Sequence, residues 1–178
     1  MANTNSSLIA AYDSTDGANQ FVSPRETGGR VRVASGTVNV IAADFENAGD
    51  TIVLCRLPHN AQMLSLKIAA NDMDGGSHSL VDIGIYPAGV NAVASAVDAD
   101  CYVTDTTDFQ TLTLLTEYRF EAIAAAPGTN ATRKLWQDAG VASDPGPRQY
   151  DIVMTQAYAT VGSPVTADVS FIIQYVVD

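Results

Sequence analysis

The chain has 178 residues, enough for one ordinary domain with a sizeable core. Nine Lys and Arg stand against twenty Asp and Glu, a formal net charge of −11, and phosphate backbones need clustered cations, so the composition argues against nucleic acid as a partner. The first residues, MANTNSSLIAAYDSTDGANQ, lack the basic start and the apolar run of a signal peptide or membrane span, so we predict no membrane contact.

Residues 1–29 are poor in large apolar side chains and rich in Asn, Ser, Thr, Asp and Gly. This composition predicts a flexible N-terminal arm over residues 1–29 and one β-sandwich domain over residues 30–178. The arm has two possible interpretations: it contacts a neighbouring molecule, or it is simply disordered. The apolar residues that could anchor it on a neighbouring molecule are Leu8, Ile9, Tyr12, Phe21 and Val22.

From Arg30 onward, short apolar runs alternate with Gly, Pro, Asp and Asn at the spacing of an all-β sandwich. No apolar stretch keeps a helical period over three turns, which argues against an α/β fold. We expect about nine strands. The segments that carry the pattern are residues 30–42, 51–57, 63–69, 79–87, 109–115, 117–124, 150–159 and 165–177.

The last segment has the strongest alternation. Strict alternation over residues 165–177 predicts a strand with one face fully in the core. The other face is mostly polar but also carries Ile172 and Val176, so we expect its end to be covered, by a loop or by another subunit. In residues 30–42, Val31 and Val33 alternate with Arg30 and Arg32 in a similar way.

One short helix is predicted over residues 130–140. Asn130 can act as the N-cap and Gly140 as the residue after the end. Leu135, Trp136 and Ala139 can then face one way, so we expect Trp136 to pack in the core and not to bind sugars.

Cys55, Arg56 and His59 lie within five positions of one another and raise the possibility of a nucleophile with its base. The pattern instead predicts a β-hairpin over residues 51–69, with Cys55 a core thiol and His59 at the tip, pointing to solvent. Four strand residues separate a thiol and an imidazole by more than about 10 Å, too far for proton transfer.

Asp72 and Asp74 in NDMDGG resemble alternate calcium ligands, but the next ligand positions hold Gly76 and Ile83. A Gly-rich hairpin turn is the preferred interpretation. His59 and His78 are too few for zinc, so we assign no catalytic, metal or cofactor residue. A pair of carboxylates of the glycosidase type stays open, because any two of the twenty acids could meet in the fold.

Several segments together resemble a family of tailed-phage head decoration, or capsid cement, proteins that are encoded beside the major capsid protein. The resemblance covers about residues 30–178. It rests on residues 32–76 with LCRLP, on VDIGIYP, on KLWQDAG followed by residues 143–160, and on the terminal FIIQYVVD. It implies a jelly-roll-like antiparallel sandwich, commonly a homotrimer, that binds the outside of a capsid.

The sequence therefore predicts a non-enzymatic virion protein made in the cytoplasm of a bacterial host. Its expected partner is the major capsid protein, with the arm and the loop tips near His59 and residues 72–76 as candidate contacts. A tail, neck or baseplate component is the alternative within structural proteins. A carbohydrate-binding jelly roll and a hydrolase on the same scaffold are the alternatives from other classes.

Overall fold

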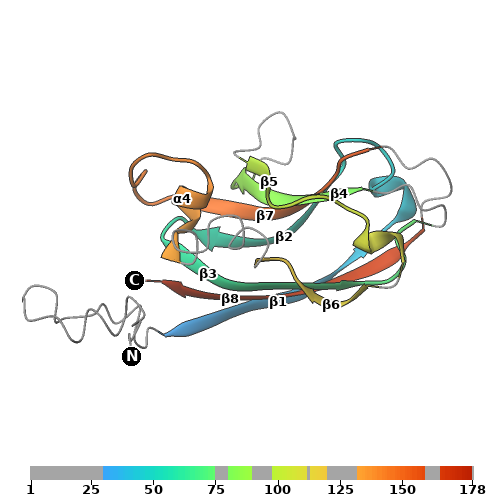
Figure 1. The fold of residues 1–178 in the computed structure, drawn as a ribbon, viewed down its shortest axis with the longest axis horizontal. Helices are drawn as coiled ribbons and strands as arrows, with labels where there is room; N and C mark the ends of the chain where they lie inside the picture. Colours follow the sequence, from blue (N-terminus) through green and yellow to red (C-terminus); the bar gives the residue numbers. More distant parts are fainter. Residues whose placement is uncertain are drawn as a thin grey trace, which may run out of the picture.

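The computed structural model describes residues 30–74, 80–89, 98–111, 113–119, 132–158 and 165–177. These residues form eight strands in two layers (Figure 1). The strands are β1 (Val31–Val40), β2 (Thr51–Pro58), β3 (Ala61–Ala70), β4 (Val81–Pro87), β5 (Asp98–Thr106), β6 (Thr113–Glu117), β7 (Gln149–Gln156) and β8 (Ala167–Val177).

The strands form four nested antiparallel pairs: β1 with β8, β2 with β7, β3 with β6, and β4 with β5. β8 also pairs with β3 and β7 with β4, which gives sheet A the order β1-β8-β3-β6 and sheet B the order β2-β7-β4-β5. One long antiparallel ribbon gives this nesting when it rolls up into the eight-stranded double sheet of a jelly roll. The predicted all-β jelly-roll-like sandwich is confirmed.

The core fills the space between the two sheets. Residues two apart on a strand share a face, so each inward face is a row of large aliphatic side chains. Burying one such side chain stabilises the fold by about 1.5–3 kcal/mol. The fully buried members include Leu66 and Ile68 on β3, Ile83 and Ile85 on β4, Ile152 on β7 and Ile173 on β8.

The predicted hairpin over residues 51–69 has its strands and turn in place, but its pairing is wrong. β2 pairs with β7 in sheet B, whereas β3 pairs with β8 and β6 in sheet A. The turn at His59 and Asn60 therefore carries the chain between the layers. Residues 71–74 likewise connect β3 of one sheet to β4 of the other, so they are no hairpin turn, and residues 75–79 lie outside the described part. Alternation specifies which face is buried and leaves the neighbouring strand undetermined.

The strand count among the described residues is eight. β5 was absent from the predicted segments, because Asp98, Asp100 and Asp105 interrupt its apolar pattern. The predicted strand over residues 109–115 begins instead as a 3-10 turn at Asp108–Gln110, and β6 follows it. β6 ends at Glu117, and residues 120–124 of the next predicted strand lie outside the described residues.

The predicted helix exists but is shorter. It is α4 (Leu135–Asp138), which lies at the end of the sandwich where β8 finishes (Figure 1). Its N-cap is Lys134, whose backbone N–H donates to the Gln137 side chain over 2.8 Å, and the predicted cap Asn130 is not among the described residues. Gly140 follows the helix with a φ of 69°, as predicted. Trp136 packs against the core, also as predicted.

The alternation predicted over residues 165–177 is confirmed from Ala167 to Ile173, since Ala167, Val169, Phe171 and Ile173 are buried. The face is not fully in the core, because Val165 lies before β8 and is exposed, and Tyr175 and Val177 are only partly buried. On the other face of β8 Val176 is also buried, whereas Ile172 is exposed. The arm predicted for residues 1–29 lies outside the described residues. No helix among the described residues is long and apolar enough to cross a membrane.

Candidate interaction surface

Cys55 packs against the core from β2. The register shifts between Val53 and Cys55, which marks a β-bulge that turns Arg56 outward while its neighbours stay inward. Burial, together with the negative charge of Asp151, raises the pKa of the Cys55 thiol to about 12. Because the thiolate is the reactive form, this cysteine is a structural thiol, as the sequence predicted.

Arg56 pairs with Asp151 directly across β2 and β7. The guanidinium Nε lies 2.6 Å from Oδ1 and Nη2 lies 3.0 Å from Oδ2, a two-pronged contact. The backbone N–H of Gly89 donates to the same carboxylate over 2.9 Å. Burial alone would raise the pKa of Asp151, but these hydrogen bonds outweigh it and the pKa is lowered. The ion pair between Arg56 and Asp151 therefore links β2 to β7 in sheet B.

His59 does not point to solvent, which corrects the sequence prediction. Its Nε2 lies 3.1 Å from Oδ1 of Asp144, and its side chain is only 14% exposed. The backbone N–H of Arg148 donates to Nδ1 over 3.4 Å, and the N–H of His59 donates to the Arg148 carbonyl over 2.9 Å. The Trp136 N–H donates to the His59 carbonyl over 3.2 Å. His59 therefore joins the inter-sheet turn to α4 and to the loop before β7.

The two acids of NDMDGG have separate local roles. Asp72 Oδ1 accepts the backbone N–H of Asp74 over 2.9 Å, which closes a local turn, and Asp74 itself is buried. Between them, the backbone of Met73 bonds to Phe109 and Val165. Within the described ranges, no group of three His, Cys, Asp or Glu side chains is arranged to hold a metal ion.

A buried ionic cluster anchors α4. Asp138 Oδ2 lies 3.4 Å from Nη2 of Arg119 and accepts the Tyr102 hydroxyl over 3.2 Å, while Oδ1 lies 3.5 Å from Nε of Arg133. The Arg119 guanidinium also lies over the Tyr102 ring, 5.5 Å from its centroid. Burial raises the pKa of Asp138, and the two arginines offset this only in part. The KLWQDAG segment thus carries a structural carboxylate.

Both faces of the VDIGIYP strand, β4, make contacts within the fold. Val81, Ile83 and Ile85 face the core. On the opposite side, Asp82 Oδ1 accepts the N–H of Asp105 over 2.8 Å, and the Tyr86 hydroxyl bonds to the Thr155 hydroxyl over 2.7 Å. The described residues of VDIGIYP therefore hold β4 in place from both faces.

Exposed apolar side chains gather on sheet A. We call its side away from the core the outer face. Val33 on β1 is 58% exposed, and β6 exposes Leu114 and Leu115 at 76% and 50%. Ile172 of β8 is also exposed and pairs with Ser35 on β1 and Lys67 on β3. The alternation in residues 30–42 thus turns valines outward, whereas Ala34 and Val38 pack on the core.

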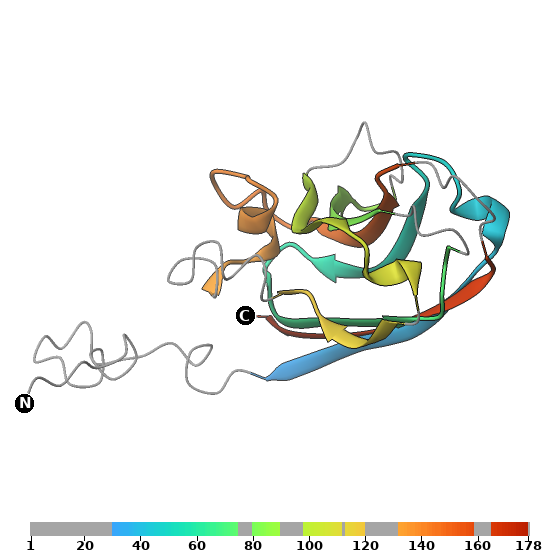
Figure 2. The same ribbon diagram turned by 45° about the vertical axis from the view of Figure 1, so that its right-hand side comes forward.

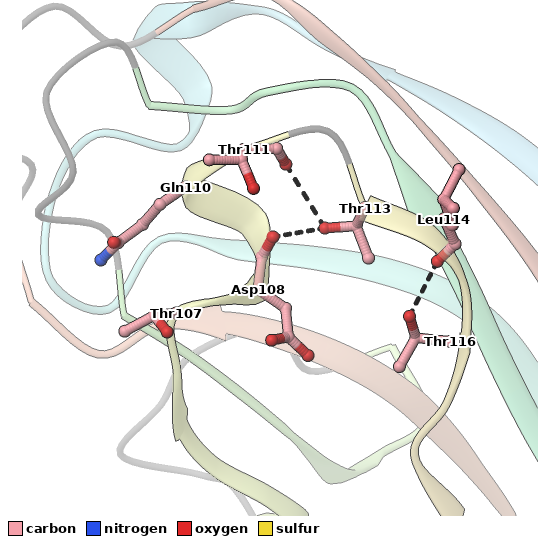
Figure 3. A pocket seen from close by; sticks show the side chains of 7 residues that line it. All are labelled: Thr107, Asp108, Gln110, Thr111, Thr113, Leu114 and Thr116. Atoms are coloured by element: carbon pink, nitrogen blue, oxygen red, sulfur yellow. Dashed lines mark hydrogen bonds between the residues drawn. The ribbon is translucent and has the colours of Figure 1, made fainter.

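Two hollows flank Leu114 on β6. The first, of about 490 Å³, is rich in hydroxyl groups (Figure 3). In it, Thr113 donates to the Asp108 carbonyl, and Thr116 donates to the Leu114 carbonyl over 2.8 Å. The second, of about 290 Å³, lies on the outer face, where Leu115 meets Ala69 and Ser170. The edge strand β6 is therefore a ridge between two hollows.

Sheet B presents an acidic hollow of about 570 Å³ that holds Asp82, Asp100 and Asp105. Burial raises the pKa of Asp82. The hydrogen bond from the Asp105 backbone N–H opposes this rise, and the negative charges of Asp105 and Asp100 add to it. Tyr158 lies in the same hollow and is 57% exposed. This surface combines an accessible ring with several carboxylates.

Sequence reasoning assigned no site residue and missed the leucines of β6 and the acids around β5. In LTLL, residues 112–115, the apolar side chains resemble those of any core strand. In the structure both leucines are exposed on the edge strand β6 of sheet A. The acids of β5 are far from Asp82 in sequence, and strand pairing brings them together.

Solved structures of two phage capsids contain chains of similar fold. A chain in the cyanophage Pam1 capsid asymmetric unit has a TM-score of 0.52 at 17% identity, covering 85% of this chain and 87% of that one. A chain in the capsid of Ralstonia phage GP4 has a TM-score of 0.57 at 18% identity, covering 83% and 85%. At this identity the likeness establishes the fold. No protein-family model and no curated protein matches the sequence.

Proposed function

We propose that this chain is a structural virion protein of a tailed bacteriophage, a decoration or cement protein that binds the major capsid protein on the outside of the head. The observation that carries the proposal is the shared fold, over most of both chains, with chains from two phage capsids. The family resemblance in the sequence points the same way. In this proposal the protein has no catalytic role.

The stabilising action would be burial of surface between neighbouring capsomers. Apolar area removed from water contributes about 25 cal/mol per Å², and many linked copies act together on one shell. The exposed Val33, Ile172, Leu114 and Leu115 of sheet A are suited to such burial. The net charge of −11 suits basic patches on a capsid and disfavours the packaged DNA.

The proposed oligomeric state is a homotrimer. The N-terminal arm over residues 1–29 is proposed as a second region of contact, with a neighbouring copy or with the capsid protein. Residue 30 leads directly into the edge strand β1, so the arm starts beside a sheet edge. An extended segment can add to such an edge, in a neighbouring copy or in the capsid protein. Deleting residues 1–29 should weaken capsid binding while the thermal unfolding of the domain stays unchanged.

A rebinding experiment tests the function. Phage heads that lack this protein are mixed with the purified protein, and bound protein is measured after sedimentation together with the heat resistance of the heads. Saturable binding and heads that open at a higher temperature are expected. Absence of binding would reject the decoration role, and labelling of tails in electron micrographs would identify the tail, neck or baseplate alternative.

Carbohydrate binding is the second candidate, favoured by the exposed Tyr158 beside Asp82, Asp100 and Asp105 in one hollow. Sugar sites combine an aromatic ring that stacks on the sugar with polar groups that hydrogen-bond its hydroxyls. A glycan array would detect this activity. Binding that Tyr158→Ala abolishes would support it, and an array without signal would remove it.

A further inference from the structure

The four sheet edges of the sandwich differ in how they are protected. Edge strands expose unpaired backbone groups, and proteins commonly shield them with charge, proline or bulges. In sheet B, β2 carries Arg56, a bulge and a terminal Pro58, and β5 carries three aspartates. In sheet A, the ten-residue β1 has no proline, no register shift and one charged residue, Arg32. The five-residue β6 has Glu117 as its one charged residue and a register shift opposite Ile68 and Ala70. Among the described residues, the edges of sheet A therefore carry fewer of these protections than the edges of sheet B.

The two edges of sheet A, β1 and β6, complement each other in charge. Residues 30–40 contain Arg30 and Arg32, both exposed, and no acid. Residues 108–117 contain Asp108 and Glu117 and no base. A β1 edge would meet another β1 edge with like charges, and β6 would do the same with β6. Of the pairings between these two edges, only β1 against β6 brings opposite charges together. Within its own chain the Glu117 carboxylate also accepts hydrogen bonds from the Ser65 hydroxyl and from the backbone N–H groups of Leu66 and Arg119.

The exposed apolar residues of β1 and β6 also lie on the same face of sheet A, its outer face. Val33 pairs with Gln174, which on its other side pairs with Ser65, and this row lies on the outer face with Ile172 and Lys67. Lys67 pairs with Glu117, and Leu115, two residues from Glu117, lines the outer-face hollow with Ala69 and Ser170. A β1 strand placed beside β6 in one continuous sheet would therefore put Val33 and Leu115 on the same face of that sheet, and both side chains are half-exposed in the single chain.

The strand directions allow this junction. Sheet A has four strands, each antiparallel to the next, so β1 and β6 run in opposite directions. A second copy set beside the first in the same orientation brings its β1 antiparallel to β6, which continues the sheet without a break in pattern. Figure 2 shows β1 and β6 in the same layer.

From these observations we infer that β1 of one copy pairs antiparallel with β6 of the next, head to tail, through the edges of sheet A. The partner is a second copy of this chain. A head-to-tail contact joins different surfaces of each subunit and closes into a ring when the rotation between copies divides a full turn. Three copies would give the homotrimer, so the inference deepens the proposed function and rests on it for the number of subunits.

Disulfide trapping tests the register. Because side chains alternate across a strand, outer-face residues of β1 must oppose outer-face residues of β6. Three double variants pair Leu115→Cys with Val31→Cys, Val33→Cys or Ser35→Cys. Under mild oxidation, at least one should give disulfide-linked dimers and trimers on a non-reducing gel. Within one chain the two positions lie on opposite edges with β8 and β3 between them, too far apart for a disulfide.

The matched control is Ile41→Cys with Leu115→Cys. Ile41 is 55% exposed, close to the exposure of Leu115, and follows the end of β1. This pair should give no ladder. Light scattering of the unmodified protein should show a trimer, and Leu115→Glu should lower its mass to that of a monomer, whereas Ile41→Glu should not.

A trimer that none of the three pairs traps would overturn the inference, because another surface would then hold the copies together. A monomer without any ladder would overturn it as well. Either result leaves the decoration role to its own test, since rebinding to heads is measured separately. The arm can be tested separately. If none of the three cysteine pairs cross-links the trimer, and deletion of residues 1–29 converts the trimer to a monomer, then the arm holds the copies together and the β1 to β6 junction is rejected.

Discussion

Gly84 on β4 lies directly beneath the backbone of Asp98, so that a β-carbon at residue 84 would overlap the carbonyl oxygen of Asp98. The start of β5 crosses the outer side of β4 at this point, and the register between the two strands shifts there. Glycine is required because only a residue without a side chain lets two backbones approach so closely. The glycine of VDIGIYP is therefore explained by packing.

Gly84→Ala should destabilise the protein, because the backbone of Asp98 and Ala99 must move to admit the methyl group. Overpacking of this kind costs about 1–3 kcal/mol, which lowers the melting temperature by about 2–12 °C in a chain of this size. The matched control is Gly36→Ala on β1, whose β-carbon would meet only the ring of Phe171, at 3.1 Å. A loss no larger than that of the control would contradict this account.

Asp151→Asn should remove stability at neutral pH and little in acid. The pKa of Asp151 is lowered in the fold, so its contribution is complete above the unfolded value of about 3.9 and is lost as pH falls through the folded value. Hydrogen bonds to a charged group contribute about 1.5–3 kcal/mol, the loss expected at pH 7. Urea unfolding at pH 7 and at about pH 2 measures both values. Equal losses at the two pH values would refute the prediction.

Cys55 should resist alkylation in the folded protein. With a pKa of about 12, only about one thiol in ten thousand is ionised at pH 8, so labelling by iodoacetamide should be at least about a thousandfold slower than in the unfolded chain. Asp151→Asn should speed the reaction, because the charge of Asp151 helps to raise this pKa. Mass spectrometry of the peptide with Cys55 separates it from Cys101. Fast labelling of folded protein would show an ionised thiol.

Asp138→Asn should destabilise the fold strongly. The change takes the charged partner from the buried Arg119, and breaking a buried ion pair costs about 3–5 kcal/mol. Asp144→Asn is the control, because it weakens the contact with His59 at a carboxylate that is half-exposed, where ion pairs contribute about 0–1 kcal/mol. Urea unfolding of the two variants measures the difference. Similar stability of both variants would show that the cluster around Asp138 contributes little.

The strand pattern in the sequence predicted most of the fold class. Alternation in residues 165–177 predicted the buried row of β8 correctly from Ala167 to Ile173. The apolar runs predicted the strands around Ile68, Ile83 and Ile152. The same reasoning failed for β5, since its aspartates remove the apolar signal and its place comes from pairing with β4. It also failed for His59, because its partner Asp144 is 85 residues away in sequence (144 − 59).

The sequence by itself determined that the chain is an all-β protein with an acidic surface and a core thiol at Cys55, because side-chain period, charge count and burial tendency are local properties. The tertiary structure decided which strands are neighbours. It placed β2 and β3 in different sheets, joined Arg56 to Asp151, and left β1 and β6 at the edges of sheet A. Pairing depends on contacts between distant segments, whose free energy no single stretch of sequence contains.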